Sequence, residues 1–185
     1  MDIAGLVRSL EASSLATTIR QSLVLFPLIE SVHVIGLTMV FGTIVIIDLR
    51  LLGVASRARP FTAVASDVLR WTWLAFAVTA TTGALMFVTN ANTYYYNNYF
   101  RAKMALLVLS GVNVLAFELT ARRSVQAWDQ KAAAPAAGRI VATVSLMLWI
   151  GVIVLGRWVG FTAASTPAPA DAETDIEALE DLIPK

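Results

Sequence analysis

Residues 31–47 read SVHVIGLTMVFGTIVII, and this stretch decides the fold class of the chain. His33 is its only ionisable residue. A helix needs about 20 mainly apolar residues to cross the hydrocarbon core of a bilayer. Four segments meet that requirement: residues 25–47, 70–90, 102–121 and 139–161. The sequence therefore predicts an all-α protein, an antiparallel four-helix transmembrane bundle.

The composition agrees with a membrane protein and excludes several other classes. Of the 185 residues, 57% are hydrophobic and 15% are charged, whereas soluble domains carry about 25% charged residues. The formal net charge is +1 and no basic patch with interleaved aromatic residues is present, so no nucleic-acid partner is expected. The absence of cysteine rules out disulfides, thiolate zinc sites and cysteine redox chemistry.

The sequence divides into three parts. Residues 1–22 place Ile3, Leu6, Val7 and Leu10 at amphipathic spacing and predict a short interfacial helix. Residues 23–161 form the transmembrane domain. In residues 162–185 a Pro/Ala-rich linker precedes a short acidic tail, where a capping-box spacing begins at Thr174. The opening MDIAGL lacks a charged n-region, so we expect the first spanning helix, not a cleaved signal peptide, to direct insertion.

The distribution of Lys and Arg predicts the orientation in the membrane. The first and third loops are rich in arginine, whereas the second loop, NANTYYYNNYF at residues 90–100, has no basic residue. Short loops rich in Lys and Arg stay in the cytoplasm. We therefore expect a multi-pass protein of the bacterial inner (cytoplasmic) membrane, with both termini and the tyrosine-rich loop on the outer side.

Glu30 and His33 are the best functional lead. They lie three residues apart and so share a helix face, and ionisable groups inside a membrane usually face a protein interior or a cavity. His33 has three interpretations: a hydrogen bond across a helix interface, a proton relay with Glu30, or a ligand to a metal or haem iron. Met86 and Met104 lie at comparable depth, and a His/Met set suits copper(I) or haem.

Glu30 also has a structural interpretation. Arg157 lies near the outer end of the last helix, where an antiparallel bundle brings it to the depth of Glu30. The two residues are candidates for a buried ion pair that fixes helix register, with Arg101 as the rival partner. Such a pair is weak evidence of stability. In the functional interpretation, Glu30 lines a cation or proton path.

A polar seam across the bundle is the wider prediction. Asp48 follows Glu30 by about five helical turns, so the same helix face carries a carboxylate at each end. Asn113 and Glu118 on the third helix are further members of the seam. Glu118 and Arg122 have the spacing of a local surface pair, which is the competing interpretation of Glu118.

The single histidine restricts cofactor sites. The Glu30-x-x-His33 spacing is that of di-iron four-helix bundles, but those sites need two copies of the motif and two more carboxylates. Bis-histidine haem needs a second histidine as well. Either site requires a symmetric oligomer interface. No nucleophile elbow, phosphate-binding glycine loop or metalloprotease helix is present, and we do not expect an enzyme.

Several segments resemble an uncharacterised bacterial inner-membrane family of unknown function with four spanning helices. They are ESVHVIG at residues 30–36, DLRLLG at 48–53, TWLAF at 72–76, TGA at 82–84, FRAK at 100–103 and GVN at 111–113. The resemblance covers approximately residues 15–161 and implies no activity. A second likeness, a helix-borne histidine followed by glycines, is similar to copper-resistance D-type membrane proteins and implies copper.

Three functional hypotheses follow. The first is translocation of protons or a cation, with Glu30 and His33 as the outer acceptor site, Asp48 and Glu118 as inner steps, and a homo-oligomer in the lipid bilayer. The second is a non-catalytic accessory subunit or assembly factor of a larger redox membrane complex. The third is haem or copper binding.

Overall fold

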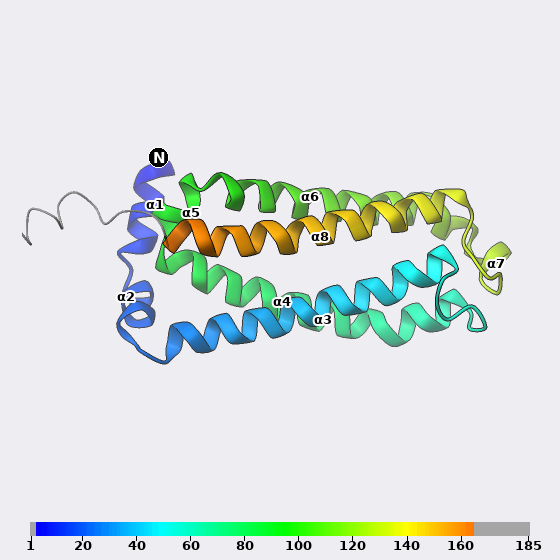
Figure 1. Cartoon of the computed structure of the whole chain (residues 1–185), viewed down its shortest axis with the longest axis horizontal. Coiled ribbons are helices and arrows are strands. Elements are labelled where there is room, and N and C mark those ends of the chain that lie inside the picture. The colour runs from blue at the N-terminus through cyan, green and yellow to red at the C-terminus, as the bar shows by residue number, and fades with distance from the viewer. Residues whose placement is uncertain (1–2, 165–185) are drawn as a thin grey trace, which may run out of the picture.

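The computed structural model describes residues 3–164, which are helical throughout apart from short connections. Four long helices run antiparallel to one another (Figure 1). They are α3 (Leu25–Leu52), α4 (Phe61–Thr89), α6 (Asn98–Leu119) and α8 (Ala136–Ala164). Each is long and apolar enough to cross a membrane, α6 together with the short helices that follow it. The predicted all-α antiparallel bundle is confirmed; the acidic tail lies outside the described residues.

The first two long helices extend further than the hydropathy pattern indicates. α3 continues to Leu52 and ends where Gly53 adopts a left-handed conformation with φ of 72°. This φ disfavours any residue with a side chain. A Cβ at this position would also lie 2.8 Å from the Ala132 carbonyl oxygen. α4 begins at Phe61, directly after Pro60. The added turns bury Phe61 in the core and therefore belong to the fold, although they reach beyond the apolar segment.

The four helices form two pairs. α3 packs along α4, α6 packs along α8, and α3 also packs against α8. The backbones of α4 and α6 are farther apart, and their side chains meet at the two ends, where Phe61 contacts Phe117 and Phe87 contacts Phe100. The order across the bundle is therefore α4–α3–α8–α6, with the α4–α6 side more open than the others.

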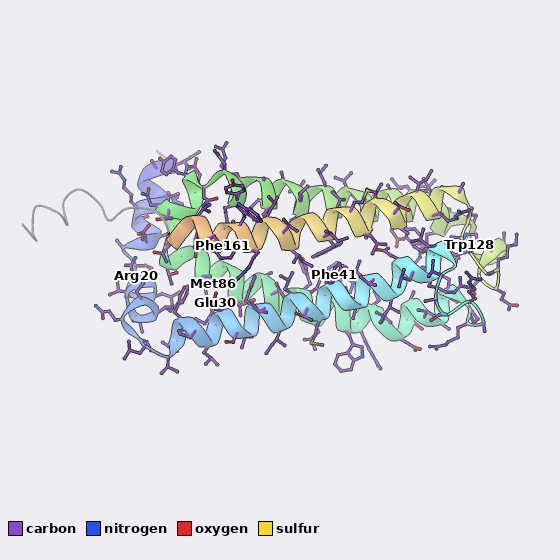
Figure 2. The ribbon with its side chains drawn as sticks, in the orientation of Figure 1. Arg20, Glu30, Phe41, Met86, Trp128 and Phe161 are labelled. Atoms are coloured by element: carbon purple, nitrogen blue, oxygen red, sulfur yellow. The ribbon has the colours of Figure 1, made fainter. Side chains whose placement is uncertain are left out.

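The two ends of the bundle differ in composition. We call the end with α5 (Ala91–Tyr96) the tyrosine end, and the end with residues 53–60 and 120–135 the arginine end. Figure 2 shows Arg20 and Trp128 at these opposite ends, with Phe41 between them. The orientation of these ends across a membrane stays a prediction.

Two helices replace the single interfacial helix expected before the bundle. α1 (Ile3–Glu11) packs on α5, and α2 (Ser14–Gln21) packs on α4 (Figure 1). The chain breaks between them because the Ser13 hydroxyl caps α2, accepting a hydrogen bond from the Ala16 N–H at 3.3 Å. Arg20 then donates to the Thr89 carbonyl oxygen at 2.9 Å and holds this segment across the tyrosine end.

The core occupies a small part of the bundle. One cluster at the arginine end contains Phe61 and Trp128, whose ring centroids are 5.1 Å apart. A second cluster around Val40, Trp149 and Val152 lies midway. Only 17% of the most apolar window of α3 is buried within the protein, so most of its apolar surface faces outward. That surface fits a lipid environment.

Candidate functional site

His33 is held against α4 by one of its two ring nitrogens. Its Nδ1 lies 3.0 Å from the Thr79 carbonyl oxygen and 3.0 Å from the Thr82 hydroxyl. A carbonyl only accepts, and the Thr82 hydroxyl donates its own proton to the Val78 carbonyl at 2.8 Å. The network therefore assigns the hydrogen to Nδ1. Nε2 makes no hydrogen bond to the described residues and is left as the acceptor.

Two glycines make this contact between the helices possible. A Cβ on Gly83 would lie 3.0 Å from His33 Cε1, and a Cβ on Gly36 would lie 2.5 Å from Thr79 Oγ1. Real Cβ atoms avoid such distances, so a side chain at either position displaces its neighbour. Both glycines belong to the segments that carry the family resemblance, and the structure gives them a physical role in seating the imidazole.

Lys103 completes a charged group around His33. It lies on α6 and, like Glu30, is within electrostatic reach of the imidazole. Its Nζ lies 5.9 Å from the centroid of the Phe100 ring. Lys103 is absent from the predicted site. Its position inside the third apolar segment, residues 102–121, was the available signal, since a lysine there is a functional candidate.

Aromatic rings cover this region at the tyrosine end. Phe87, Tyr94 and Phe100 stack with centroid distances of 5.4, 5.7 and 6.5 Å and bring α4, α5 and α6 together. Burial, followed by the negative charge of Glu30, raises the pKa of the Tyr94 hydroxyl above its ordinary value. Glu30 is therefore within electrostatic reach of both Tyr94 and His33.

The structure does not bring Glu30 and Arg157 together. Neither Arg157 nor its rival Arg101 forms an ion pair with Glu30 in the described part of the chain. The Arg157 guanidinium instead lies 4.7 Å from the Phe161 ring centroid, one turn along the same helix. A register-fixing ion pair is thus not present in this structure, and Glu30 is exposed on the bundle surface.

The predicted metal ligands do not form a preformed cluster with other ligating groups. Within residues 3–164, no group of three His, Asp or Glu side chains is placed to hold a metal ion. Met86 and Glu30 both lie toward the tyrosine end (Figure 2), and the Met104 side chain is exposed. Ligation by His33 with these two sulfurs stays a prediction.

Asp48 is the second notable acidic group. It is only 4% exposed, and its Oδ2 has no hydrogen-bond partner. The Ser145 side chain of α8 faces the carboxyl group. Buried polar atoms are nearly always paired, and an isolated buried carboxylate is strongly disfavoured. The geometry therefore suits a carboxyl group that holds a proton or meets a small cation.

An apolar layer separates Asp48 from His33. The two residues are fifteen positions apart on α3, about 22 Å along the helix axis. The cluster of Val40, Trp149 and Val152 fills the bundle between them, with Phe41 packed against it. Within one protomer the predicted seam is therefore two polar sites rather than a continuous track.

One known protein family matches the region of the chain that contains the four-helix bundle. The model of a family described as "Family of unknown function (DUF6644)" matches residues 17–162. The chain belongs to the DUF6644 family. No curated protein and no solved structure matches it. The predicted membership of an uncharacterised family is confirmed; a bacterial origin and the likeness to copper-resistance D-type proteins stay predictions.

Two other seam residues of this DUF6644 protein have local structural partners. Asn113 donates from Nδ2 to the Val141 carbonyl oxygen at 3.1 Å and ties α6 to α8. Glu118 accepts from Arg122 at 3.2 Å. Both side chains of that pair are about half exposed, as expected for a surface pair at this spacing.

Arg50 is the buried group that the sequence interpretation missed. It is 0% exposed in the DUF6644 structure, and its guanidinium donates to four backbone carbonyl oxygens. They belong to Arg59 at 2.9 Å, Asp129 and Lys131 at 3.0 Å, and Ala132 at 3.4 Å. Arg50 is not among the predicted site residues, although it lies in DLRLLG, a segment of family resemblance. Three of its four partners lie about eighty residues away in sequence, so no local pattern identifies them.

Proposed function

We propose that this DUF6644 protein binds and translocates protons or a small cation across a bilayer, with His33 as the acceptor at the tyrosine end. The observation that carries the proposal is the fixed imidazole. Because Nδ1–H is held by Thr79 and Thr82, the proton is gained and lost at Nε2. Glu30 and Lys103, two groups of opposite charge, are both within electrostatic reach of the imidazole, as expected for the surroundings of a proton-binding group.

Asp48 provides the second step in this proposal. Its unpartnered oxygen is a proton-binding position near the arginine end. The apolar layer in between means that a proton cannot pass through one rigid protomer by hydrogen bonds alone. We therefore propose a homo-oligomer in the lipid bilayer, in which the open α4–α6 side of one copy meets another and a wetted path connects the two sites.

Proteoliposome flux tests the proposal. A pH-sensitive dye reports proton entry after a potential is imposed across vesicles that contain the full chain. We expect His33→Ala, Glu30→Gln and Asp48→Asn to reduce the flux, each by tenfold or more for a required carrier. Glu118→Gln is the matched control, since that exposed carboxylate is already paired with Arg122. Unchanged flux in folded His33→Ala and Glu30→Gln proteins would refute these roles.

Purification in mild detergent tests the assembly. The proposal requires a homogeneous homo-oligomer. Foreign subunits that co-purify in fixed stoichiometry would favour the accessory-subunit hypothesis instead. The acidic tail, which could dock on such a partner, lies outside the described residues, so this part of the hypothesis rests on the sequence alone.

Haem or copper binding is a second candidate because of one specific contact. Metal-ligating histidines commonly donate their other ring N–H to a backbone carbonyl, as Nδ1 of His33 does to Thr79. Nε2 is then the ligating atom, and a second copy supplies the second histidine. An absorption spectrum and metal analysis of purified protein decide this. A colourless, metal-free preparation that cannot be reconstituted would end it.

A further inference from the structure

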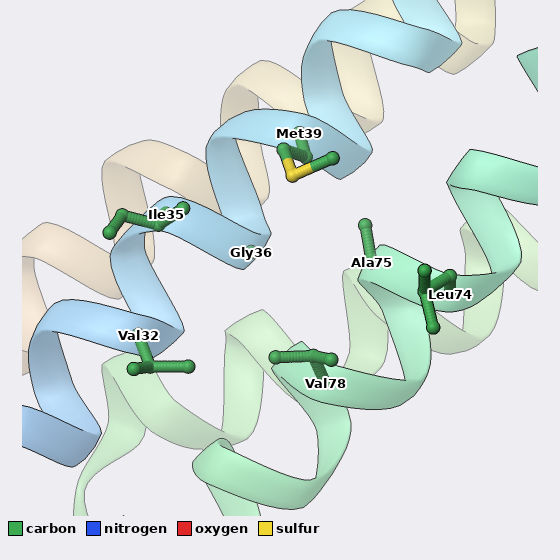
Figure 3. Close-up of a pocket in the computed structure, with 7 residues that line it drawn as sticks. All are labelled: Val32, Ile35, Gly36, Met39, Leu74, Ala75 and Val78. Carbon is green, nitrogen blue, oxygen red and sulfur yellow. The ribbon is translucent and has the colours of Figure 1, made fainter.

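An apolar groove runs along the outward face of the α3–α4 pair. Its rims are Ile35 and Met39 on α3 and Leu74 and Val78 on α4, and its floor is formed by Gly36 and Ala75 (Figure 3). The cavity volume is about 190 Å³. All of the residues that line it are apolar. The rim side chains of Ile35 and Leu74 are more than half exposed, so the groove opens to the surroundings of the bundle.

The groove exists because the floor residues are small. Gly36 has no room for a side chain, since a Cβ would lie 2.5 Å from Thr79 Oγ1. The helices meet there, while the longer rim side chains project outward on either side of the contact. The result is a shallow apolar channel parallel to the helix axes.

A cationic group lies at the arginine-end mouth of this groove. Arg70 and Trp71 precede Leu74 and Ala75 by one turn, so they continue the same face of α4. The Arg70 guanidinium carbon lies 5.7 Å from the centroid of the Trp71 ring. Asp67, the nearest acidic residue in sequence, is held by Arg59 at 2.6 Å. Arg70 forms no ion pair with the described carboxylates and keeps its charge available.

The groove lies at the depth of the acyl chains of one leaflet. Arg70 on α4 lies twenty residues before Asn90, the C-cap of that helix, which is a rise of about 30 Å and equals the thickness of the hydrocarbon core. Arg70 therefore lies at the level of the phosphates on the arginine-end side. Leu74 and Val78 are about 6 and 12 Å deeper, within the acyl region of that same leaflet.

We propose that the groove holds one acyl chain of an anionic phospholipid whose phosphate is bound by Arg70. The apolar lining accepts the chain, the guanidinium supplies the complementary charge, and Trp71 lies at the interface where tryptophan is favoured. This inference does not depend on proton translocation, because neither His33 nor Asp48 takes part.

Native mass spectrometry of the full chain tests the proposal. Phosphatidylglycerol and phosphatidylcholine with identical acyl chains are titrated into the detergent-solubilised protein. We expect one phosphatidylglycerol to be retained per chain in preference to phosphatidylcholine. Arg70→Gln should lower its retention about fivefold, the effect of one cationic side chain near a membrane surface. Arg57→Gln, which removes an exposed arginine of the adjacent loop, should change it little.

Filling the groove provides the second arm of the experiment. Val78→Trp should reduce retention of the lipid, whereas Val108→Trp, at an exposed position on α6, should not. Equal affinity for both lipids, or equal effects of Arg70→Gln and Arg57→Gln, would overturn the proposal. So would a Val78→Trp protein that binds phosphatidylglycerol normally but loses its oligomeric state, because that result identifies the occupant as a second copy of the chain.

Discussion

Two cations of this molecule, the buried Arg50 and the half-buried Lys103, have opposite surroundings. Arg50 at the arginine end has no exposed surface and gives its hydrogen bonds to four loop carbonyls. Lys103, toward the tyrosine end, makes no hydrogen bond to the described residues and has an aromatic ring and the His33 imidazole as neighbours. A polar group whose hydrogen-bonding capacity is saturated stabilises one geometry. A polar group with unsaturated hydrogen-bonding capacity can still bind a proton or an ion.

The same contrast holds for the acidic residues. Asp129 accepts hydrogen bonds from the Thr62 N–H at 2.8 Å and the Thr62 hydroxyl at 2.9 Å, and so caps α4. Glu30 has no such partner, and Asp48 has one unpaired oxygen. The arginine-end loops are thus an architectural region. Polar atoms without a hydrogen-bond partner in the described part of the chain belong instead to Glu30, His33, Lys103 and Asp48.

The largest expected effect comes from removing the saturated cation. Arg50→Met deletes the donor to four part-buried carbonyl oxygens. An unsatisfied buried group costs about 1–3 kcal/mol, and water recovers much of this cost at part-buried acceptors. We expect the free energy of unfolding to fall by about 3–5 kcal/mol. Denaturation in detergent measures it. The exposed Arg57→Met variant is the control, and an equal loss in both variants would contradict the architectural role of Arg50.

A smaller effect is expected where the imidazole is seated. Gly36→Ala introduces a Cβ 2.5 Å from Thr79 Oγ1, so α3 and α4 must separate slightly near His33. Overpacking of this kind costs about 1–3 kcal/mol. Gly42→Ala in the same helix is the matched control, because nothing lies within 4 Å of its added Cβ. If both variants unfold alike, the close approach at Gly36 does not position the imidazole.

The sequence predicts one of these two regions better than the other. The spanning helices follow from hydropathy alone, because each apolar segment must satisfy its own backbone in lipid. The His33 site was found because an imidazole is conspicuous among apolar residues. The contacts of His33 with Thr79 and Thr82 could not be predicted, since they depend on which helix packs against α3.

The arginine end was the harder region to predict. Asp129 and Arg50 are far apart in sequence, and their bonds to the backbone leave no residue-type pattern. Glu30 and Arg157 show the reverse error: matching depth along two helices suggested an ion pair, but depth does not determine which face a side chain occupies. Helix rotation about its own axis is decided by packing, which a single sequence does not reveal.

A third prediction concerns acid stability at the arginine end. The Thr62 N–H, more than the Thr62 hydroxyl or the charge of Arg50, lowers the pKa of Asp129 below its ordinary value. A lowered pKa in the folded state stabilises the fold above the unfolded value of about 3.9, and this contribution is lost as pH falls through the folded pKa. Asp129→Ala should cost about 1 kcal/mol near neutral pH, as loss of a helix cap does, and Asp129→Asn less, because its amide oxygen still accepts from the Thr62 N–H.

The pH profile distinguishes this capping role from a general effect. The wild-type protein should lose stability on acidification below about pH 4, whereas Asp129→Asn should lose less because its side chain does not titrate. Asp67→Asn is the control, an exposed aspartate in α4 that is paired only with Arg59. If Asp129→Asn and the wild-type protein lose stability alike on acidification, the Asp129 carboxylate does not stabilise the arginine end.

The smallest expected effect lies at the tyrosine end and reports on the unsaturated region directly. Burial and the charge of Glu30 together raise the pKa of Tyr94. Glu30→Gln removes the charge but not the burial, so the pKa should fall part of the way toward its ordinary value. Ultraviolet titration of the phenolates measures this, with Glu118→Gln at the opposite end as the control. Since the raised pKa disfavours ionisation in the folded state, wild-type stability should decline above about pH 10, and less steeply in Glu30→Gln. An unchanged tyrosine titration would mean that Glu30 is screened by water from Tyr94, and it would then be a poor electrostatic partner for His33 as well.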